Sequence, residues 1–362
     1  MAVKYLAGNR IQGTNAERVA TSLPSGTYTG WKEIGRTTLS SAGDVIDVGS
    51  LPNKRYYMVI RNIIGGDGNM AVYNRLNGDT GSSYAYRQSE NGATDAVTSS
   101  AVTSVVYDTG GDANDKFDIT YISNLAGGEK LAIGHGINRN TAGVGNAPAR
   151  GEFTWKWANT SNAITTINTL NDTNNQSGNF NTGSEVVVLG YDPTDTNTTD
   201  FWQELKTATV SSGDNLDSGI FTPKKYMWVQ AWGKISPANG APAIRVGNNS
   251  IDTGSNYAYR ASSNGGNTGA VPNACNIDTA PAFIGNNETF FINMFIVNDS
   301  SKEKLMIWNI MLSSASGASN APTRRKGVSK WVNTSNQINN IRIWNNASGD
   351  YSNGQIKVWG HD

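Results

Sequence analysis

The second part of this 362-residue sequence repeats the first, and this duplication limits the possible folds more than any other feature. The clearest match sets DTGSSYAYR at residues 79–87 against DTGSNYAYR at residues 252–260. KWANTSN at residues 156–162 likewise returns as KWVNTSN at residues 330–336. The offset between matched residues changes little along the chain, so a single duplication with few insertions explains both copies. Internal repeats of this kind predict two similar structural units in tandem.

The matched segments also predict the domain boundaries. We place one domain at residues 31–192 and a homologous one at residues 202–362, joined by a short polar linker at residues 193–201. Residues 1–30 precede the first copy and have no apolar pattern with which to form a core. We therefore predict an extended N-terminal arm there, ordered by lying on a neighbouring subunit.

Within each copy, the apolar residues have the spacing of β-strands. YYMVIRNII at residues 56–64 is aromatic and β-branched, and it is followed by a glycine-rich turn. FDITYI at residues 117–122 and EFTWKW at residues 152–157 alternate with a period of two. Turn signals separate about eight or nine such strands per copy, and no long segment has a helical period. The prediction is an all-β chain of two tandem homologous jelly-roll-like β-sandwich domains with an extended N-terminal arm.

Charge and composition argue against several classes of function. The 29 basic residues equal the 29 acidic ones, so the basic surface typical of nucleic-acid binders is not expected. Two histidines and one cysteine leave little scope for a zinc site, a disulfide framework or a Cys/His nucleophile pair. No segment has the apolar length of a membrane span or of a secretory signal. We expect no cofactor, no direct nucleic-acid binding and no membrane partner.

Carboxylates are the remaining candidates for catalysis, because glycoside hydrolysis needs a pair at a fixed separation. Glu152 and Glu185 lie in predicted strands of the first copy. Glu152 has Lys326 as its counterpart in the second copy, a change that is easier to explain at a structural position than in a duplicated active site. We therefore predict that the protein is not an enzyme.

Aspartates close together in a turn are a second candidate, for calcium. Calcium binds carboxylate and carbonyl oxygens, but the spacing here follows no known calcium-binding loop. Solvated turn residues are the favoured interpretation. The aspartates concerned are Asp108, Asp112, Asp115 and Asp118.

The repeated Tyr-Ala-Tyr-Arg segment is the most distinctive motif, and it has two interpretations. Exposed on a strand, its tyrosines could stack on sugar rings while the arginine binds hydroxyl groups. Buried, they would pack the sandwich and bond their hydroxyls at its rim. Packing is favoured, because both copies keep the whole segment and both must fold. The candidate ligand or interface residues are Tyr84, Tyr86 and Arg87 in the first copy and Tyr257, Tyr259 and Arg260 in the second.

Tryptophans divide into those that the copies share and those that they do not. Trp157 and Trp331 occupy matched positions and are interpreted as core residues or as anchors at the end of a sheet. Trp228, Trp232 and Trp359 occur in the second copy alone. Because aromatic residues are enriched where protein surfaces meet, we predict that these three make inter-domain or inter-subunit contacts.

Two segments resemble, in their amino-acid sequence, a group of uncharacterised structural proteins of marine phages and other viruses. These segments are MAVKYLAGNRIQGT at residues 1–14 and SEVVVLGYDP at residues 184–193. In size and architecture, two tandem sandwiches also resemble the double jelly rolls of viral capsid proteins. The resemblance implies a virion location after assembly in the host cytoplasm, and it transfers no catalytic motif.

From these observations we predict a non-enzymatic virion structural protein, namely a capsid shell, decoration or tail-surface subunit. It would self-assemble through its β-sandwich domains and its N-terminal arm, with copies of itself and other virion proteins as partners. The alternative is a tandem carbohydrate-binding, lectin-like module that recognises host surface glycans, since paired weak sites gain avidity.

Overall fold

The computed structural model describes residues 29–66, 68–98, 102–106, 112–171, 177–195, 200–236, 239–279, 288–313 and 320–362. Over these residues the chain is all-β, with strands, turns and loops and no helix. These ranges accordingly contain no helix that could cross a bilayer. Of the arm predicted at residues 1–30, all but Thr29 and Gly30 lies outside the described residues.

The first half of the molecule forms a large sheet and a small sheet, and every strand pair in them is antiparallel. The large sheet has the order β1-β12-β3-β8-β9-β10-β5-β6, and the small sheet has the order β2-β11-β4-β7. The strands are β1 (Lys32–Thr38), β2 (Val45–Val48), β3 (Tyr56–Ile63), β4 (Val72–Leu76), β5 (Tyr84–Glu90), β6 (Ala96–Val97), β7 (Val105–Val106), β8 (Lys116–Ser123), β9 (Lys130–Asn138), β10 (Ala149–Trp157), β11 (Ile167–Asn171) and β12 (Glu185–Tyr191).

The second half repeats this arrangement. Its large sheet has the order β13-β25-β15-β21-β22-β23-β18-β19, and its small sheet has the order β14-β24-β16-β17, with β20 also paired to β16. The strands are β13 (Gln203–Val210), β14 (Asn215–Asp217), β15 (Tyr226–Ser236), β16 (Pro242–Asn248), β17 (Ser250–Ile251), β18 (Tyr257–Ser263), β19 (Gly266–Ala274), β20 (Ile277–Asp278), β21 (Thr289–Val297), β22 (Lys304–Leu312), β23 (Thr323–Trp331), β24 (Asn340–Asn345) and β25 (Asp350–His361).

The two large sheets share one strand order, which is the result expected if one duplicated sequence folds twice. The strand register shows that the two halves also correspond residue by residue. Ile119, His135 and Glu152 lie opposite one another on β8, β9 and β10, and their counterparts Asn293, Asn309 and Lys326 do so on β21, β22 and β23. The described residues contain more strands per half than the eight or nine expected, because short pairs such as Ala96–Val97 and Ser250–Ile251 have too few residues to show a pattern.

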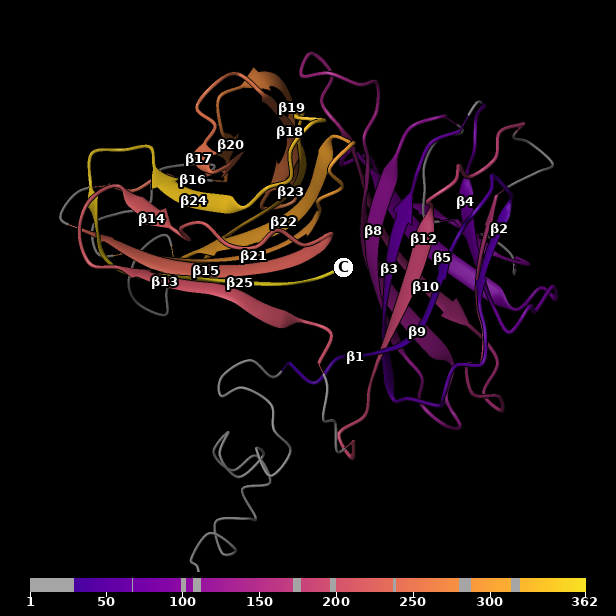
Figure 1. Ribbon diagram of the computed structural model, residues 1–362. Helices are drawn as coiled ribbons and strands as arrows, with labels where there is room; N and C mark the ends of the chain where they lie inside the picture. The colour runs from indigo at the N-terminus through magenta and orange to yellow at the C-terminus, as the bar shows by residue number, and fades with distance from the viewer. Residues whose placement is uncertain are drawn as a thin grey trace, which may run out of the picture.

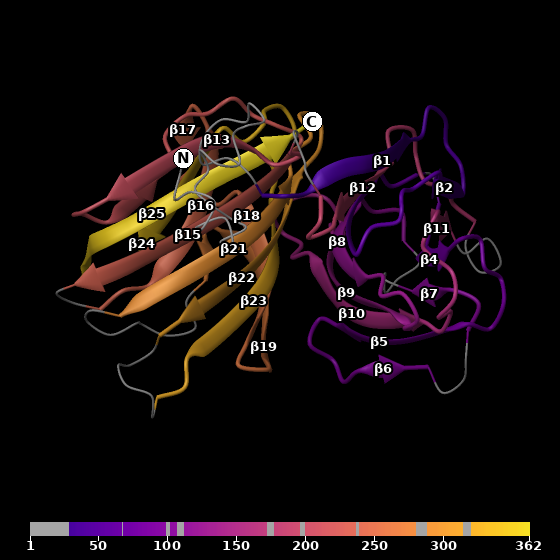
Figure 2. The same cartoon turned by 90° about the horizontal axis from the view of Figure 1, so that it is seen from below.

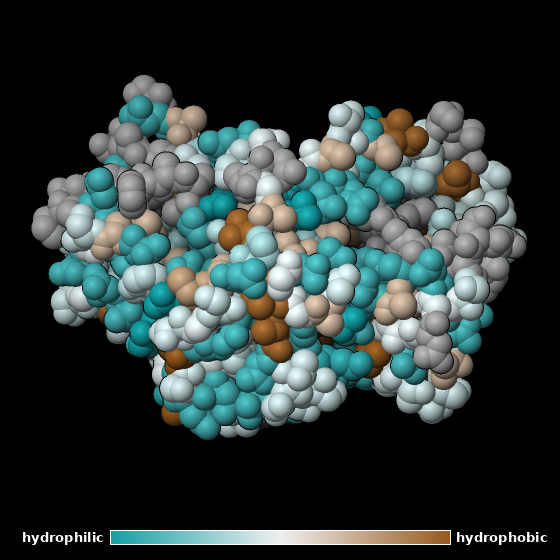
Figure 3. Space-filling view, turned by 90° about the horizontal axis from the view of Figure 1, so that it is seen from above, coloured by the Kyte–Doolittle hydropathy of each residue, from teal (hydrophilic) through white to brown (hydrophobic). Residues whose placement is uncertain are grey.

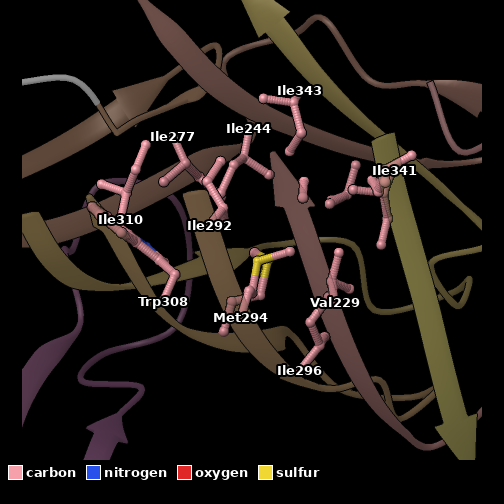
Figure 4. Packing of buried hydrophobic residues seen from close by; sticks show 14 of the residues in the cluster. Val229, Ile244, Ile277, Ile292, Met294, Ile296, Trp308, Ile310, Ile341 and Ile343 are labelled. Atoms are coloured by element: carbon pink, nitrogen blue, oxygen red, sulfur yellow. The ribbon is translucent and has the colours of Figure 1, made fainter. Parts of the chain in front are cut away.

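Each half encloses its own core between its two sheets. In the first half, side chains such as Val59 and Trp155 of the large sheet meet Val72 and Ile167 of the small sheet. Figure 4 shows the corresponding core of the second half, where isoleucines from both sheets gather around Met294. The alternation of buried and exposed side chains along these strands follows from the two-residue period of a strand.

The two cores fill one equivalent space in opposite ways. In the first half, the ring of Phe153 lies over its cross-strand neighbour Gly134, where a Cβ atom would come 2.0 Å from the ring. In the second half, the large residue is Trp308 and the glycine is its cross-strand neighbour Gly327, where a Cβ atom would come 2.3 Å from the indole. A dense core holds one large ring at this place, and either strand can supply it.

The two halves lie side by side with their large sheets turned toward one another at an angle (Figure 1). Seen from below, strands β13, β25, β15, β21, β22 and β23 lie next to one another on the near side of the second half (Figure 2). We call the side of each large sheet that faces away from its own small sheet the outward face. The two outward faces meet at the junction between the halves.

Candidate functional site

The junction between the halves is an apolar cluster built from both outward faces. The first half contributes aliphatic side chains from neighbouring strands, among them Met58, Ile60 and Leu189. The second half contributes mainly aromatic ones. Trp228 stacks on Trp359 with ring centroids 4.9 Å apart. Such a cluster resembles a domain core more than a transient surface contact, so it holds the halves together.

Polar contacts surround this cluster. The carboxylate of Glu185, on β12, accepts a hydrogen bond from the Tyr226 hydroxyl at 2.7 Å and pairs with Lys225 at 3.0 Å. Arg260 donates from Nε to the carbonyl of Pro148 at 3.0 Å, which links β18 to the loop before β10. These contacts orient one half on the other, because the buried charge of Glu185 needs hydrogen-bonded partners and two of them come from the second half.

A cleft of about 430 Å³ opens beside the cluster, between the two outward faces. Its polar walls come from two equivalent cross-strand rows, with His135 and Glu152 on one side and Asn293, Asn309 and Lys326 on the other. Glu152 and Lys326 form an ion pair across the cleft, although they are counterparts in the two copies. Tyr121, Ile133, Phe295 and Ile307 add apolar surface. A cleft of this size and mixed lining can take a small polar molecule.

The histidine in this cleft is held in its neutral form. Burial lowers the pKa of His135 from 6.5 to about 4. The charge of Glu152 opposes this shift, whereas the charges of Arg150 and Lys326 add to it. The buried Nε2 atom of His135 has no hydrogen-bond partner in the described part of the chain. At neutral pH the ring therefore adds no charge to the cleft.

The first tyrosine of the repeated motif lies in the core of each half. The hydroxyl of Tyr84 accepts from the backbone N–H of Leu76 at 2.9 Å and donates to its carbonyl at 3.2 Å. Its ring stacks on Trp157, whose indole N–H donates to Asp79 at 2.7 Å. Burial raises the pKa of Tyr84 to about 12.

The second half repeats these contacts residue for residue. Tyr257 bonds the backbone of Val246, and the indole of Trp331 donates to Asp252 at 2.8 Å. Because Tyr84 and Tyr257 are fully buried, neither can stack on a sugar ring, and the structure places both in packing roles. For these two tyrosines the favoured packing interpretation holds, and the alternative of an exposed ligand face does not.

The other residues of the motif differ between the copies. Tyr259 is buried in the second core, and Tyr86 packs partly buried against the first. Arg87 is exposed, lines the cleft and pairs with Asp95 at 3.1 Å. Arg260 instead joins the two halves, as described above. The two arginines occupy the same position in the two copies but make different contacts.

The three tryptophans predicted to make inter-domain or inter-subunit contacts lie in two different places. Trp228 and Trp359 lie in the cluster between the halves, where the indole of Trp228 donates to Asn293 at 2.7 Å. Trp232 follows four residues after Trp228 on β15 and therefore lies on the same outward face, where it is 40% exposed. Trp232 is not part of the apolar cluster between the halves.

The two carboxylates considered for catalysis cannot act as a pair. Glu185 is on β12 and Glu152 on β10, with three strands of the same sheet between them. At the usual strand spacing they are about 19 Å apart, well beyond the separation that glycoside hydrolysis needs. The pKa of Glu185 is lowered because Thr38, Lys225, Tyr226 and Arg36 outweigh its burial, which suits a structural anion rather than a general acid.

Three of the four aspartates considered for calcium each have a cationic partner. Asp112 pairs with Lys116 at 2.8 Å, Asp115 with Arg139 at 3.2 Å, and Asp118 with Arg61 at 2.9 Å. Asp108 lies outside the described residues. Among the residues described, no group of three or more His, Cys, Asp or Glu side chains is arranged to hold a metal ion.

Comparison with known proteins assigns no family. No family model and no curated protein matches the chain. Among solved structures, domains LG4-5 of the mouse laminin alpha1 chain align over 92% of this chain and 89% of that one, at 8% identity and a TM-score of 0.20. Neisserial surface protein A aligns over 81% and 99% at 7% identity and a TM-score of 0.14. Scores this low support no inference about fold or function.

The sequence singled out some residues of the junction and missed others. Trp228, Trp359 and Arg260 were candidates, whereas Asn293 and Asn309 were not. A comparison of the two copies could have pointed to these residues. The strand position that is the apolar Ile119 in the first copy is the amide Asn293 in the second, and both residues line the cleft.

Proposed function

We propose that the chain is a non-enzymatic structural protein of a virus particle, as a capsid shell, decoration or tail-surface subunit. It assembles with copies of itself and with other virion proteins through two tandem jelly-roll-like sandwich domains and the arm at residues 1–30. Its place is the virion, after assembly in the host cytoplasm.

The observation that carries this proposal is apolar surface that the described part of the chain leaves exposed. On the second half, Trp232, Phe291 and Met311 lie opposite one another on β15, β21 and β22, and all three are exposed. On the first half, Tyr121 and Ile133 form a similar exposed pair on β8 and β9, where they also line the cleft. By contrast, the face seen from above is mostly hydrophilic, with small separate apolar spots (Figure 3). Contiguous apolar surface on a soluble domain marks a contact site, and here it lies on sheets that already pack face to face.

Electron microscopy of the purified full-length chain tests the proposal. Regular assemblies of one size or one repeat are expected, and their number should fall at low protein concentration. A chain that stays monomeric at high concentration would contradict it.

A second function, recognition of glycans on the host surface, is favoured by the cleft between the halves. Its amides, Asn293 and Asn309, can bond sugar hydroxyls, and Tyr121 offers a ring for stacking. A glycan array tests this function: binding that is lost in Asn309→Ala but kept in Asn336→Ala, a variant on an exposed turn, would support it. An array without any signal would reject it.

A further inference from the structure

Each half covers a different part of its outward face at the junction. The first half buries Ile60, Phe117 and Ile137, whose counterparts in the second half are Gln230, Phe291 and Met311. The second half buries a different set, whose first-half counterparts stay exposed. That set is Tyr226, Phe295, Leu305 and Ile307, with the counterparts Tyr56, Tyr121, Leu131 and Ile133.

The exposed fractions show this exchange at two pairs of counterparts. Ile133 is 66% exposed, whereas its counterpart Ile307 is 2% exposed. In the opposite sense, Phe291 is 42% exposed, whereas its counterpart Phe117 is 1% exposed. On either side of a shared centre, where Met58 and Leu189 lie in the cluster together with their counterparts Trp228 and Trp359, the part of the face that one half buries is the part that the other leaves exposed.

A contact between two different parts of similar units is heterologous, or head-to-tail. Such a contact leaves one unused part at each end. Here the unused parts are the second-half patch (Trp232, Phe291 and Met311) and the first-half patch (Tyr56, Tyr121, Leu131 and Ile133).

We infer that the second-half patch of one chain docks on the first-half patch of a second copy, and so repeats between chains the contact that joins the two halves. This inference rests on the proposed self-assembly and adds its surface, its partner and its polarity. The partner is a second copy because Phe291, Met311 and all four residues of the first-half patch correspond to residues that already lie in the apolar cluster between the halves.

The chemistry of the two patches suits this pairing. Each is continuous across neighbouring strands: Trp232 lies opposite Phe291 and Phe291 opposite Met311 on one, and Tyr121 lies opposite Ile133 on the other. Within the chain, Phe117 and Ile137 occupy the same cluster as Leu305 and Ile307. Between chains, Phe291 and Met311 would meet Leu131 and Ile133, which are residues of the same kind. A head-to-tail contact continues from copy to copy and ends in a ring or a filament.

The test uses two variants of the full-length chain, one in each patch. Met311→Asp blocks the second-half patch and Ile133→Asp blocks the first-half patch. Both side chains are at least half exposed, so both variants should keep the circular dichroism spectrum and the unfolding midpoint of the wild type. Ile220→Asp, an equally exposed apolar position outside both patches, is the control and should assemble as the wild type does.

Sedimentation velocity then separates the possible outcomes. Each patch variant alone should be monomeric, because one partner of every contact is blocked. An equimolar mixture should form heterodimers and nothing larger, because only one contact remains intact. A patch variant that assembles alone, or a mixture that stays monomeric, would overturn the head-to-tail inference while leaving self-assembly in place. A wild-type chain that never assembles would overturn the proposed function itself.

Discussion

The buried pair of Arg61 and Asp118 gives the first core a chemistry that the second core lacks. Both side chains are fully buried, joined at 2.9 Å, and Arg61 also donates to Thr169 at 3.1 Å. The counterparts on β15 and β21 are Ala231 and Ile292, both apolar and buried. The duplication thus offers a natural comparison between a buried ion pair and an apolar replacement.

Removing one partner of this pair should cost far more than replacing both. Asp118→Ala removes the anion with which the buried guanidinium of Arg61 pairs, which we expect to lower the free energy of unfolding by about 3–5 kcal/mol. The double variant Arg61→Ala with Asp118→Ile copies the second half and should lose much less. Urea unfolding of the two variants measures the difference. A double variant that is as unstable as the single one would show that the pair itself stabilises the core.

Tyr84 tests the packing role of the repeated motif. Tyr84→Phe keeps the ring but leaves the buried N–H and carbonyl of Leu76 without the hydroxyl, so we expect a loss of about 1–3 kcal/mol. Tyr86→Phe, a partly buried neighbour in the same strand, is the matched control and should change stability little. Equal effects of the two substitutions on the thermal midpoint would contradict this account.

At the scale of strands, the sequence was informative because alternation is a local property. The segments at residues 117–122 and 152–157 lie within β8 (Lys116–Ser123) and β10 (Ala149–Trp157), and the all-β class is confirmed. Alternation could not show which outward positions are covered, because coverage depends on a neighbour far along the chain. Trp228 and Trp232 have the same orientation on β15, yet one lies in the junction and the other is exposed.

The cross-strand row of His135 and Glu152 predicts how acid weakens the junction. The histidine pKa is 6.5 without burial and about 4 in the folded chain, so between these values the unfolded chain binds a proton that the folded chain does not. The contribution of His135 to the free energy of unfolding is therefore fully present above about pH 6.5 and is lost as the pH drops toward 4, by at most about 3–4 kcal/mol.

Thermal unfolding as a function of pH checks this expectation. The control is His135→Asn, which introduces the residue found at the matched position, Asn309. This variant should lose the decline between pH 6.5 and pH 4 while keeping any change below that range. An unaltered decline in the variant would assign it to other groups.

For the whole molecule, duplication explains more than the two similar sheets. The copies have diverged where they meet: Glu152 faces its own counterpart Lys326, and the aliphatic Met58 faces a surface rich in tryptophan. A contact between matched positions cannot be predicted from the sequence. A comparison of the two copies shows that two positions differ, but not that their side chains touch.

The central claim is that the uncovered parts of the two outward faces join copies of the chain head to tail. Electron cryomicroscopy of the assembled full-length protein tests it most directly. We expect Phe291 and Met311 of each copy to contact Leu131 and Ile133 of the next, in the same arrangement as the junction within the chain. An assembly in which Trp232, Phe291 and Met311 remain exposed to solvent would contradict the claim.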